Sequence, residues 1–150
     1  MSLRILIAYD GSPGSRAAVS EAGRLFPGAE AVVVYARQPL EGMAAHLEHH
    51  PDVEDLRRLD ESTLDSSQQV AVEGAKLAVD HGLVASAEVT STMRPPWSAI
   101  VEAASAAEAS VVVLGSRGRG AIGSALLGST SAAVTHHVGR PVLIVPAPAE

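Results

Sequence analysis

The feature that most constrains the fold is the alternation of short apolar runs with longer segments of helical character. The runs lie at 4–9 (RILIAY), 29–36 (AEAVVVYA), 84–93 (VASAEVTSTM), 110–115 (SVVVLG) and 141–146 (PVLIVP). Apolar runs of this length predict buried strands. Strands that alternate with helices predict a parallel sheet covered on both faces, so we expect a three-layer α/β sandwich with five strands.

The helical segments have recognisable starts and stops. Ser12 and Pro13 fit a helix start, with serine as N-cap and proline in the first helical position. That helix is expected to end near Leu25. Residues 37–50 are expected to form a loop or a weak helix. The remaining helices are predicted at about 52–81, 97–109 and 129–139.

Length and composition bound the class of protein. The chain has 150 residues, of which 47% are hydrophobic, and we expect residues 1–150 to form one domain with a mostly aliphatic core. The absence of cysteine excludes disulfide and thiol chemistry. No signal peptide and no run of about 18 apolar residues is evident, which predicts a cytoplasmic protein without membrane contact.

The charge of the chain argues against nucleic acid as a partner. Formal net charge is −6, and Lys76 is the only lysine beside ten arginines. Non-specific binding to nucleic acid requires a basic stripe, which this composition does not provide. Arg117 and Arg119 are notable because both fall within a stretch rich in glycine, where they could add positive charge.

Two polar clusters follow predicted strands. Asp10, Gly11 and Ser12 come after the first strand, and GSRGRGAIGSALLGSTS at 115–131 comes after the fourth. Ligands of parallel sheets bind at the carboxyl ends of strands, where the strand order reverses. If the first and fourth strands are neighbours, both clusters face one crevice.

The glycine stretch fits neither of two common nucleotide loops. A Walker A loop requires a lysine that is absent here. The dinucleotide pattern G-x-G-x-x-G occurs as Gly118, Gly120 and Gly123, but an acidic residue is expected about 20 positions further on. Ile144 and Val145 stand near that place instead.

A third spacing fits better. Gly115 and Gly118 are separated by two residues, and nine more precede Gly128, which is followed by Ser129. Such a loop leaves the strand at glycines and ends at a helix N-terminus, where amide groups, hydroxyls and the helix dipole favour an anion.

In this spacing the sequence resembles the ATP-binding branch of the universal stress protein family, whose motif is G-x2-G-x9-G-[S/T]. The resemblance covers nearly the whole chain and includes RILIAYDGSPGSRAAV, ASVVVLGSRGRG and GRPVLIVP. It implies a parallel sheet of order 3-2-1-4-5 with the adenine nucleotide alpha hydrolase-like fold. It also implies a stress-response protein that binds ATP.

The resemblance implies roles for single residues. Asp10 would reach the ribose, although Asp10 to Ser12 also reads as a turn and helix cap. Adenine would lie against residues that otherwise read as ordinary core, namely Ala8, Ala36 and Leu114. The phosphates would lie on the glycine loop, at Gly115, Arg117, Gly118, Gly128, Ser129 and Thr130. Because this loop has no lysine, Mg²⁺ is implied with ATP (or ADP or AMP).

Family members commonly form homodimers through the last strand, and the same is expected here through 141–146. No arrangement of a nucleophile and base is evident, so we expect at most slow ATP hydrolysis. One alternative is a dimeric, chaperone-like stress protein that works without nucleotide. Another is a nucleotidyl-transfer enzyme, which would require a different signature after the first strand.

The sequence also departs from the family and contains other candidates. Tyr35 replaces a histidine common in the family, and Arg94 to Trp97 is an unusual helix start, with Trp97 expected to pack or line a surface groove. A solvated face is favoured over a metal site for His46, His49 and His50. Helix capping or packing is favoured for His136 and His137, and a solvated helix or a lid for 52–65.

Overall fold

The computed structural model describes residues 3–37, 53–116 and 127–148. It contains one five-stranded parallel sheet of order β3-β2-β1-β4-β5, which confirms the predicted fold class. The strands are β1 (Arg4–Ala8), β2 (Glu30–Arg37), β3 (Val84–Ser91), β4 (Val111–Gly115) and β5 (Val142–Val145). The helices are α1 (Pro13–Leu25), α3 (Val53–Asp80), α4 (Pro96–Ala106) and α5 (Ser129–His137).

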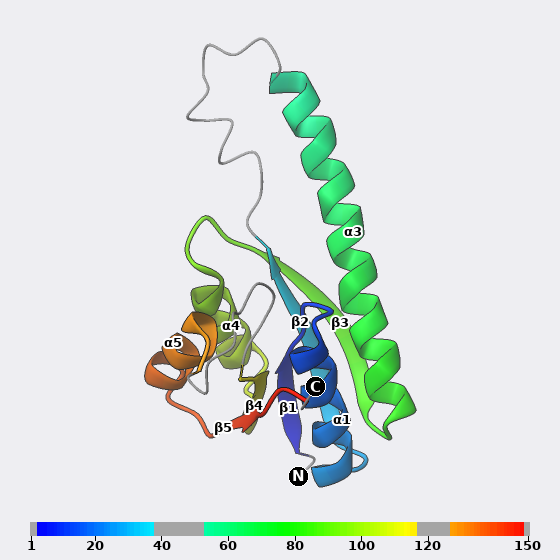
Figure 1. Cartoon of the computed structure of the whole chain (residues 1–150), viewed down its shortest axis with the longest axis vertical. Helices are drawn as coiled ribbons and strands as arrows, with labels where there is room; N and C mark the ends of the chain where they lie inside the picture. The colour runs from blue at the N-terminus through cyan, green and yellow to red at the C-terminus, as the bar shows by residue number, and fades with distance from the viewer. Residues whose placement is uncertain (1–2, 38–52, 117–126, 149–150) are drawn as a thin grey trace.

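Helices cover both faces of the sheet, with α1 and α3 on one side and α4 and α5 on the other (Figure 1). The alternation of side chains along a strand produces these two cores. Ile5 and Ile7 of β1 point toward α1 and α3, whereas Leu6 between them packs with Ile100 and Val134. Ile5, Leu6 and Ile7 are all fully buried. Because the strand is covered on both faces, its sequence is one continuous apolar run.

The predicted helix boundaries are close to the observed ones. Ser12 is the N-cap of α1, and its side chain accepts a hydrogen bond from the Ser15 amide. The long helix begins at Val53 and ends at Asp80, and Gly82 then adopts a φ of 91°, which only glycine adopts without strain. None of the described helices has the length and apolar character needed to cross a membrane.

Two details differ from the expectation. The third strand ends at Ser91 rather than at Met93, and Ser91 pairs with Arg37, the last described residue of β2. In α4, the sequence pattern predicts Ile100, Val101, Ala104 and Ala107 on one face, but the buried residues are Ala99, Ile100, Ala103 and Ala104, and Val101 and the C-cap Ala107 are only partly buried. The small alanines let α4 approach β1 and β2 closely.

Close backbone contacts set the distances between layers. A Cβ on Gly74 of α3 would lie 2.6 Å from the Tyr9 ring and 2.8 Å from a methyl group of Val33. A Cβ on Gly115 would lie 2.8 Å from the backbone of Gly14 in α1. Real Cβ atoms do not come so close, so both glycines are required for packing. The packing against Gly14 therefore requires glycine at position 115 whether or not a ligand binds.

We predict that Gly74→Ala destabilises the protein, although alanine is the better helix former. The added methyl group must displace the Tyr9 ring and Val33, and overpacking of this kind costs about 1–3 kcal/mol. Urea unfolding measures the change. Val72→Ala, at an exposed position of the same helix, is the control and should change stability by less than about 0.5 kcal/mol. A Gly74→Ala protein as stable as the original would contradict this account of the contact.

Candidate functional site

A cavity of about 440 Å³ opens at the carboxyl ends of β1, β2 and β4. Eight of the ten candidate residues line it, and they come from segments far apart in the sequence. These are Ala8, Asp10, Ala36, Leu114, Gly115, Gly128, Ser129 and Thr130. The other two, Arg117 and Gly118, lie outside the described residues, as do His46, His49 and His50.

One wall of the cavity is apolar. Ala8, Ala36 and Leu114 belong to the core on the α4 and α5 side of the sheet, where Val34 and Ile100 extend the same wall. The two alanines keep the wall shallow, and Leu114 is only 3% exposed. A small apolar wall at the end of a sheet fits a flat, uncharged ring.

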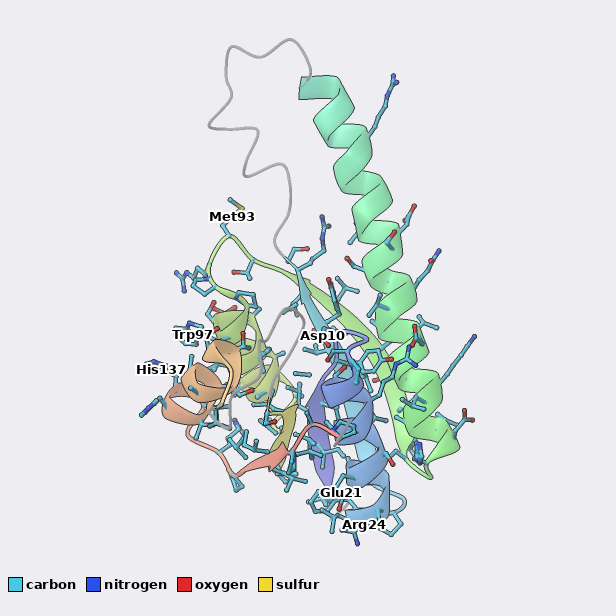
Figure 2. The ribbon with its side chains drawn as sticks, viewed as in Figure 1. Asp10, Glu21, Arg24, Met93, Trp97 and His137 are labelled. Carbon is cyan, nitrogen blue, oxygen red and sulfur yellow. The ribbon has the colours of Figure 1, made fainter. Side chains whose placement is uncertain are left out.

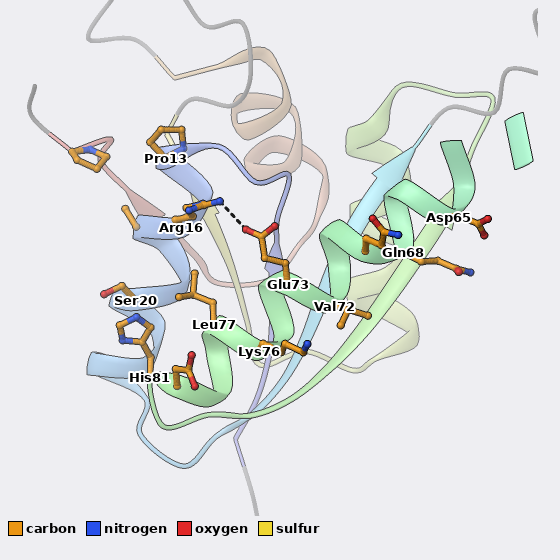
Figure 3. A pocket seen from close by; sticks show the side chains of 14 residues that line it. Pro13, Arg16, Ser20, Asp65, Gln68, Val72, Glu73, Lys76, Leu77 and His81 are labelled. Atoms are coloured by element: carbon orange, nitrogen blue, oxygen red, sulfur yellow. Dashed lines mark hydrogen bonds and ion pairs between the residues drawn. The ribbon is translucent and has the colours of Figure 1, made fainter. Parts of the chain in front are cut away.

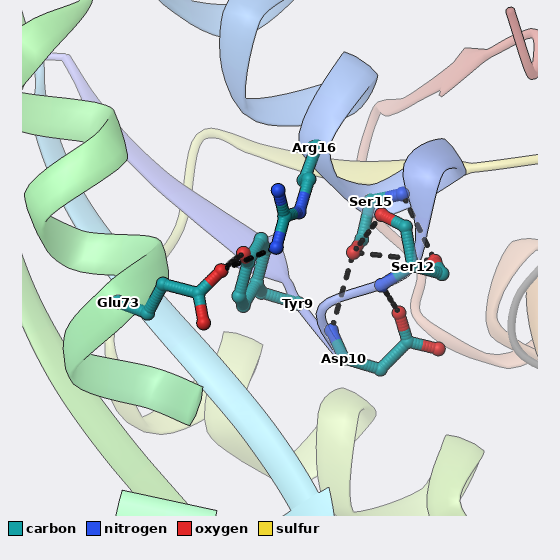
Figure 4. A network of polar contacts seen from close by, with 6 residues as sticks. All are labelled: Tyr9, Asp10, Ser12, Ser15, Arg16 and Glu73. Carbon is teal, nitrogen blue, oxygen red and sulfur yellow. Dashed lines mark hydrogen bonds and ion pairs between the residues drawn. The ribbon is translucent and has the colours of Figure 1, made fainter. Parts of the chain in front are cut away.

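The opposite wall is the turn that follows β1. Asp10 Oδ1 accepts a hydrogen bond of 2.9 Å from the Ser12 amide, and the Asp10 amide donates to Ser15 Oγ. Gly11 between them has a φ of 81°. These bonds, drawn in Figure 4, close the turn. The half-buried Asp10 lines the cavity. Both interpretations of Asp10, a turn residue and a cavity residue, therefore apply together.

Two helices point their N-termini at the cavity, but their amides are satisfied differently. In α1, Ser12 caps the Ser15 amide. In α5, the N-cap is Gly128, and no side chain caps this helix among the described residues. The Gly128 amide itself donates to the Ser116 carbonyl over 2.7 Å. The first amides of α5 thus form the open helix terminus, where an anion is favoured.

Ser131 was not singled out from the sequence, yet it anchors this terminus. Its hydroxyl donates a hydrogen bond of 2.7 Å to the Gly115 carbonyl and so fixes the first turn of α5 to the end of β4. The side chain is nearly buried, with 5% exposure. The only sequence signal was the run of Ser129, Thr130 and Ser131, whose individual roles depend on where each points.

The described lining residues carry one acidic side chain, Asp10, and no lysine, arginine or histidine. A phosphate chain would therefore meet amides and hydroxyls there rather than cations. The turn after β1 and the start of α5 also offer oxygen atoms, which are the ligands that Mg²⁺ prefers. These oxygens belong to Asp10, Ser12, Ser129 and Thr130. No group of three or more metal-ligating side chains occurs within the described ranges. These residues would therefore supply one or two oxygen ligands to a Mg²⁺ ion that is bound together with a phosphate group.

A polar network joins this turn to helix α3. The Tyr9 hydroxyl donates to Glu73 Oε1 over 2.8 Å, and Arg16 donates to the same oxygen over 2.7 Å (Figure 4). Burial raises the pKa of Tyr9 to about 12, assisted by its hydrogen bond to Glu73 and by the charge of that carboxylate. Arg16 acts in the opposite direction but more weakly.

Trp97 and His137 lie away from the Asp10 turn (Figure 2). Their rings stack with centroids 4.4 Å apart and thereby connect the start of α4 to the end of α5. Neither residue lines the cavity. A larger, open groove of about 1160 Å³ lies between α1 and α3 and contains Glu73 and Arg16 (Figure 3). Its lining mixes apolar, acidic and basic side chains and lacks the convergence of strand ends seen at the smaller cavity.

We predict that Tyr9→Phe changes the alkaline limb of the stability curve. Folding favours the neutral phenol, because its pKa rises from 10.0 to about 12. The stabilisation is thus complete below pH 10 and is lost as the pH rises toward 12. Urea unfolding at a series of alkaline pH values should show a steeper loss for the original protein than for Tyr9→Phe. If the stabilities of the two proteins changed equally with pH, Tyr9 would have the same pKa in the folded and unfolded states, which would contradict the prediction.

The chain is similar to known proteins over nearly its whole length. The model of the universal stress protein family matches residues 1–146. A universal stress protein of Thermus aquaticus, from the 3′ region of QAH/OAS sulfhydrylase, is 33% identical over 145 residues, which cover 94% of this chain and 96% of the relative.

Solved structures share the fold of this chain. The structure of protein MJ0577 matches with a TM-score of 0.81 and 19% identity, over 100% of this chain and 99% of that one. A universal stress protein in complex with cAMP matches with a TM-score of 0.62 and 24% identity, over 98% of each chain. The chain belongs to the universal stress protein family.

Proposed function

We propose that this chain binds an adenine nucleotide, ATP with Mg²⁺, in the cavity at the ends of β1, β2 and β4. The observation that carries the proposal is the convergence of an apolar wall, the Asp10 turn and the open N-terminus of α5 on one space. The complex of a family member with cAMP supports an adenine nucleotide as the class of ligand.

Each part of the nucleotide has a matching surface. Adenine would lie on the wall of Ala8, Ala36 and Leu114, and the ribose hydroxyls would donate to the Asp10 carboxylate. The phosphates would reach Ser129 and Thr130 at the start of α5, where amides and hydroxyls face the cavity. Arg117 and Gly118 would complete the phosphate end from the loop that follows β4.

The charge of the residues that line the cavity favours binding of Mg²⁺ together with the nucleotide. A triphosphate brings several negative charges into a cavity whose described lining already contains Asp10 and no basic side chain. A Mg²⁺ ion bound with the triphosphate would offset that charge, and Asp10, Ser129 or Thr130 would supply its protein oxygen ligands. We propose ATP binding with at most slow hydrolysis, in a nucleotide-dependent regulatory role in the stress response.

Calorimetry with purified protein tests the proposal, together with mass spectrometry of any ligand released on denaturation. We expect ATP to bind in the presence of Mg²⁺ and to bind more weakly when EDTA removes the metal, whereas AMP should depend less on it. Protein that carries no nucleotide and gives no heat with ATP and Mg²⁺ would defeat the proposal. That outcome would favour the alternative of a stress protein that works without nucleotide.

Asp10→Asn is expected to weaken ATP binding by about ten-fold or more, since hydrogen bonds to a charged acceptor contribute about 1.5–3 kcal/mol. Asparagine keeps an oxygen that can accept from the Ser12 amide, so the turn should persist while the charge is lost. Asp80→Asn, at the end of α3 and outside the cavity, is the matched control. Equal affinities for the original protein and Asp10→Asn would place the ribose elsewhere.

We also propose that the protein is a homodimer through β5. This strand pairs with β4 on one side and forms one end of the sheet, and its Val142, Leu143 and Ile144 are only partly buried. Unpaired strand edges tend to be covered. Sedimentation at micromolar concentration should show a dimer, and a change at a partly buried position of this strand, such as Ile144→Lys, should yield a monomer. A monomer for the original protein would refute the proposal.

A further inference from the structure

Glu73 of α3 binds both residues that bracket the turn after β1. Tyr9 precedes Asp10, and Arg16 follows Ser15, the last residue of the turn's hydrogen-bond network. Both donate to the same oxygen, Glu73 Oε1, over 2.8 and 2.7 Å. One carboxylate on a helix distant in sequence thus holds the two ends of the segment that carries Asp10 (Figure 4).

Inside the turn, the hydrogen bonds are local. Ser12 donates to Asp10, Asp10 donates to Ser15, and Ser15 bonds back to Ser12. These bonds set the shape of the turn. The segment is also attached to the rest of the protein: the Tyr9 amide donates to the Val34 carbonyl, the backbone of Gly14 lies against Gly115, and Tyr9 and Arg16 reach Glu73.

We propose that Glu73 is a positioning residue for nucleotide binding. It lines the groove between α1 and α3 and not the cavity, so it does not reach the ligand itself (Figure 3). It acts through Tyr9 and Arg16 by fixing the direction in which the turn presents the Asp10 carboxylate. This inference rests on the proposed nucleotide function and adds helix α3 to the parts of the chain that determine affinity.

The two attachments differ in strength. Tyr9 is 2% exposed, so the donor of its hydrogen bond to Glu73 is shielded from water, although the Glu73 carboxylate that accepts it faces the open groove. The side chains of Arg16 and Glu73 are 57% and 49% exposed, and ion pairs at such exposure contribute little. The hydroxyl of Tyr9 should therefore carry most of the positioning. The close contact of its ring with Gly74 keeps that hydroxyl beside Glu73.

The experiment compares Glu73→Leu and Glu73→Gln by calorimetry with ATP and Mg²⁺. Glu73→Leu removes both attachments and should weaken binding by about five- to ten-fold. Glu73→Gln keeps an oxygen that accepts from Tyr9 and should recover most of the affinity. Glu21→Leu is the control, because it breaks an ion pair with Arg24 at the far end of α1, and it should bind ATP as the original protein does.

A double-mutant cycle distinguishes positioning from a general loss of stability. If Glu73 acts through Asp10, Glu73→Leu should change the affinity of an Asp10→Asn protein much less than that of the original. Equal fold-changes in both backgrounds, or no loss in Glu73→Leu, would overturn the inference while the nucleotide function stands. Should Glu73→Leu fail to fold, Tyr9→Phe carries the same expectation. If the original protein binds no adenine nucleotide, the proposed function and this inference both fail.

Discussion

The central place of β1 in the sheet is the constraint on which the rest of the structure depends. The strand is paired on one side with β2 and on the other with β4, and the chain order reverses there. Because all strands are parallel, the segments that follow β1 and β4 leave at the same edge and diverge. The 440 Å³ cavity lies at this point, and its polar wall comes from those two segments.

The two faces of the sheet contribute to the cavity in different ways. On the α4 and α5 side, small side chains and an uncapped helix N-terminus leave room and open amides. On the α1 and α3 side, Tyr9, Gly74 and Glu73 pack the base of the same turn tightly. The turn after β1 thus packs against α3 on one face of the sheet and lines the cavity on the other. Support of this kind reduces the conformational freedom that a ligand would otherwise have to remove.

The strands, the helix starts and the glycine loop could be predicted from the sequence because they depend on local patterns. The apolar runs gave the five strands, Ser12 with Pro13 marked the start of α1, and the glycine spacing indicated a loop that ends at a helix. The strand order and the candidate residues came from resemblance to the family, since no local pattern determines which strands are neighbours. The side chains around Glu73 gave no such signal, because Tyr9 and Glu73 are 64 positions apart.

The sequence by itself determined the elements, their approximate ends and the residue types at the carboxyl edge, because hydrophobic periodicity and helix capping act over a few neighbouring residues. The role of each group, by contrast, depends on contacts between distant segments. The tertiary structure showed that Gly115 is required by the backbone of Gly14, that the Gly128 amide already bonds to Ser116, and that α5 has the uncapped terminus. Packing between layers makes these assignments, since contacts between distant segments form only when the sheet brings them together.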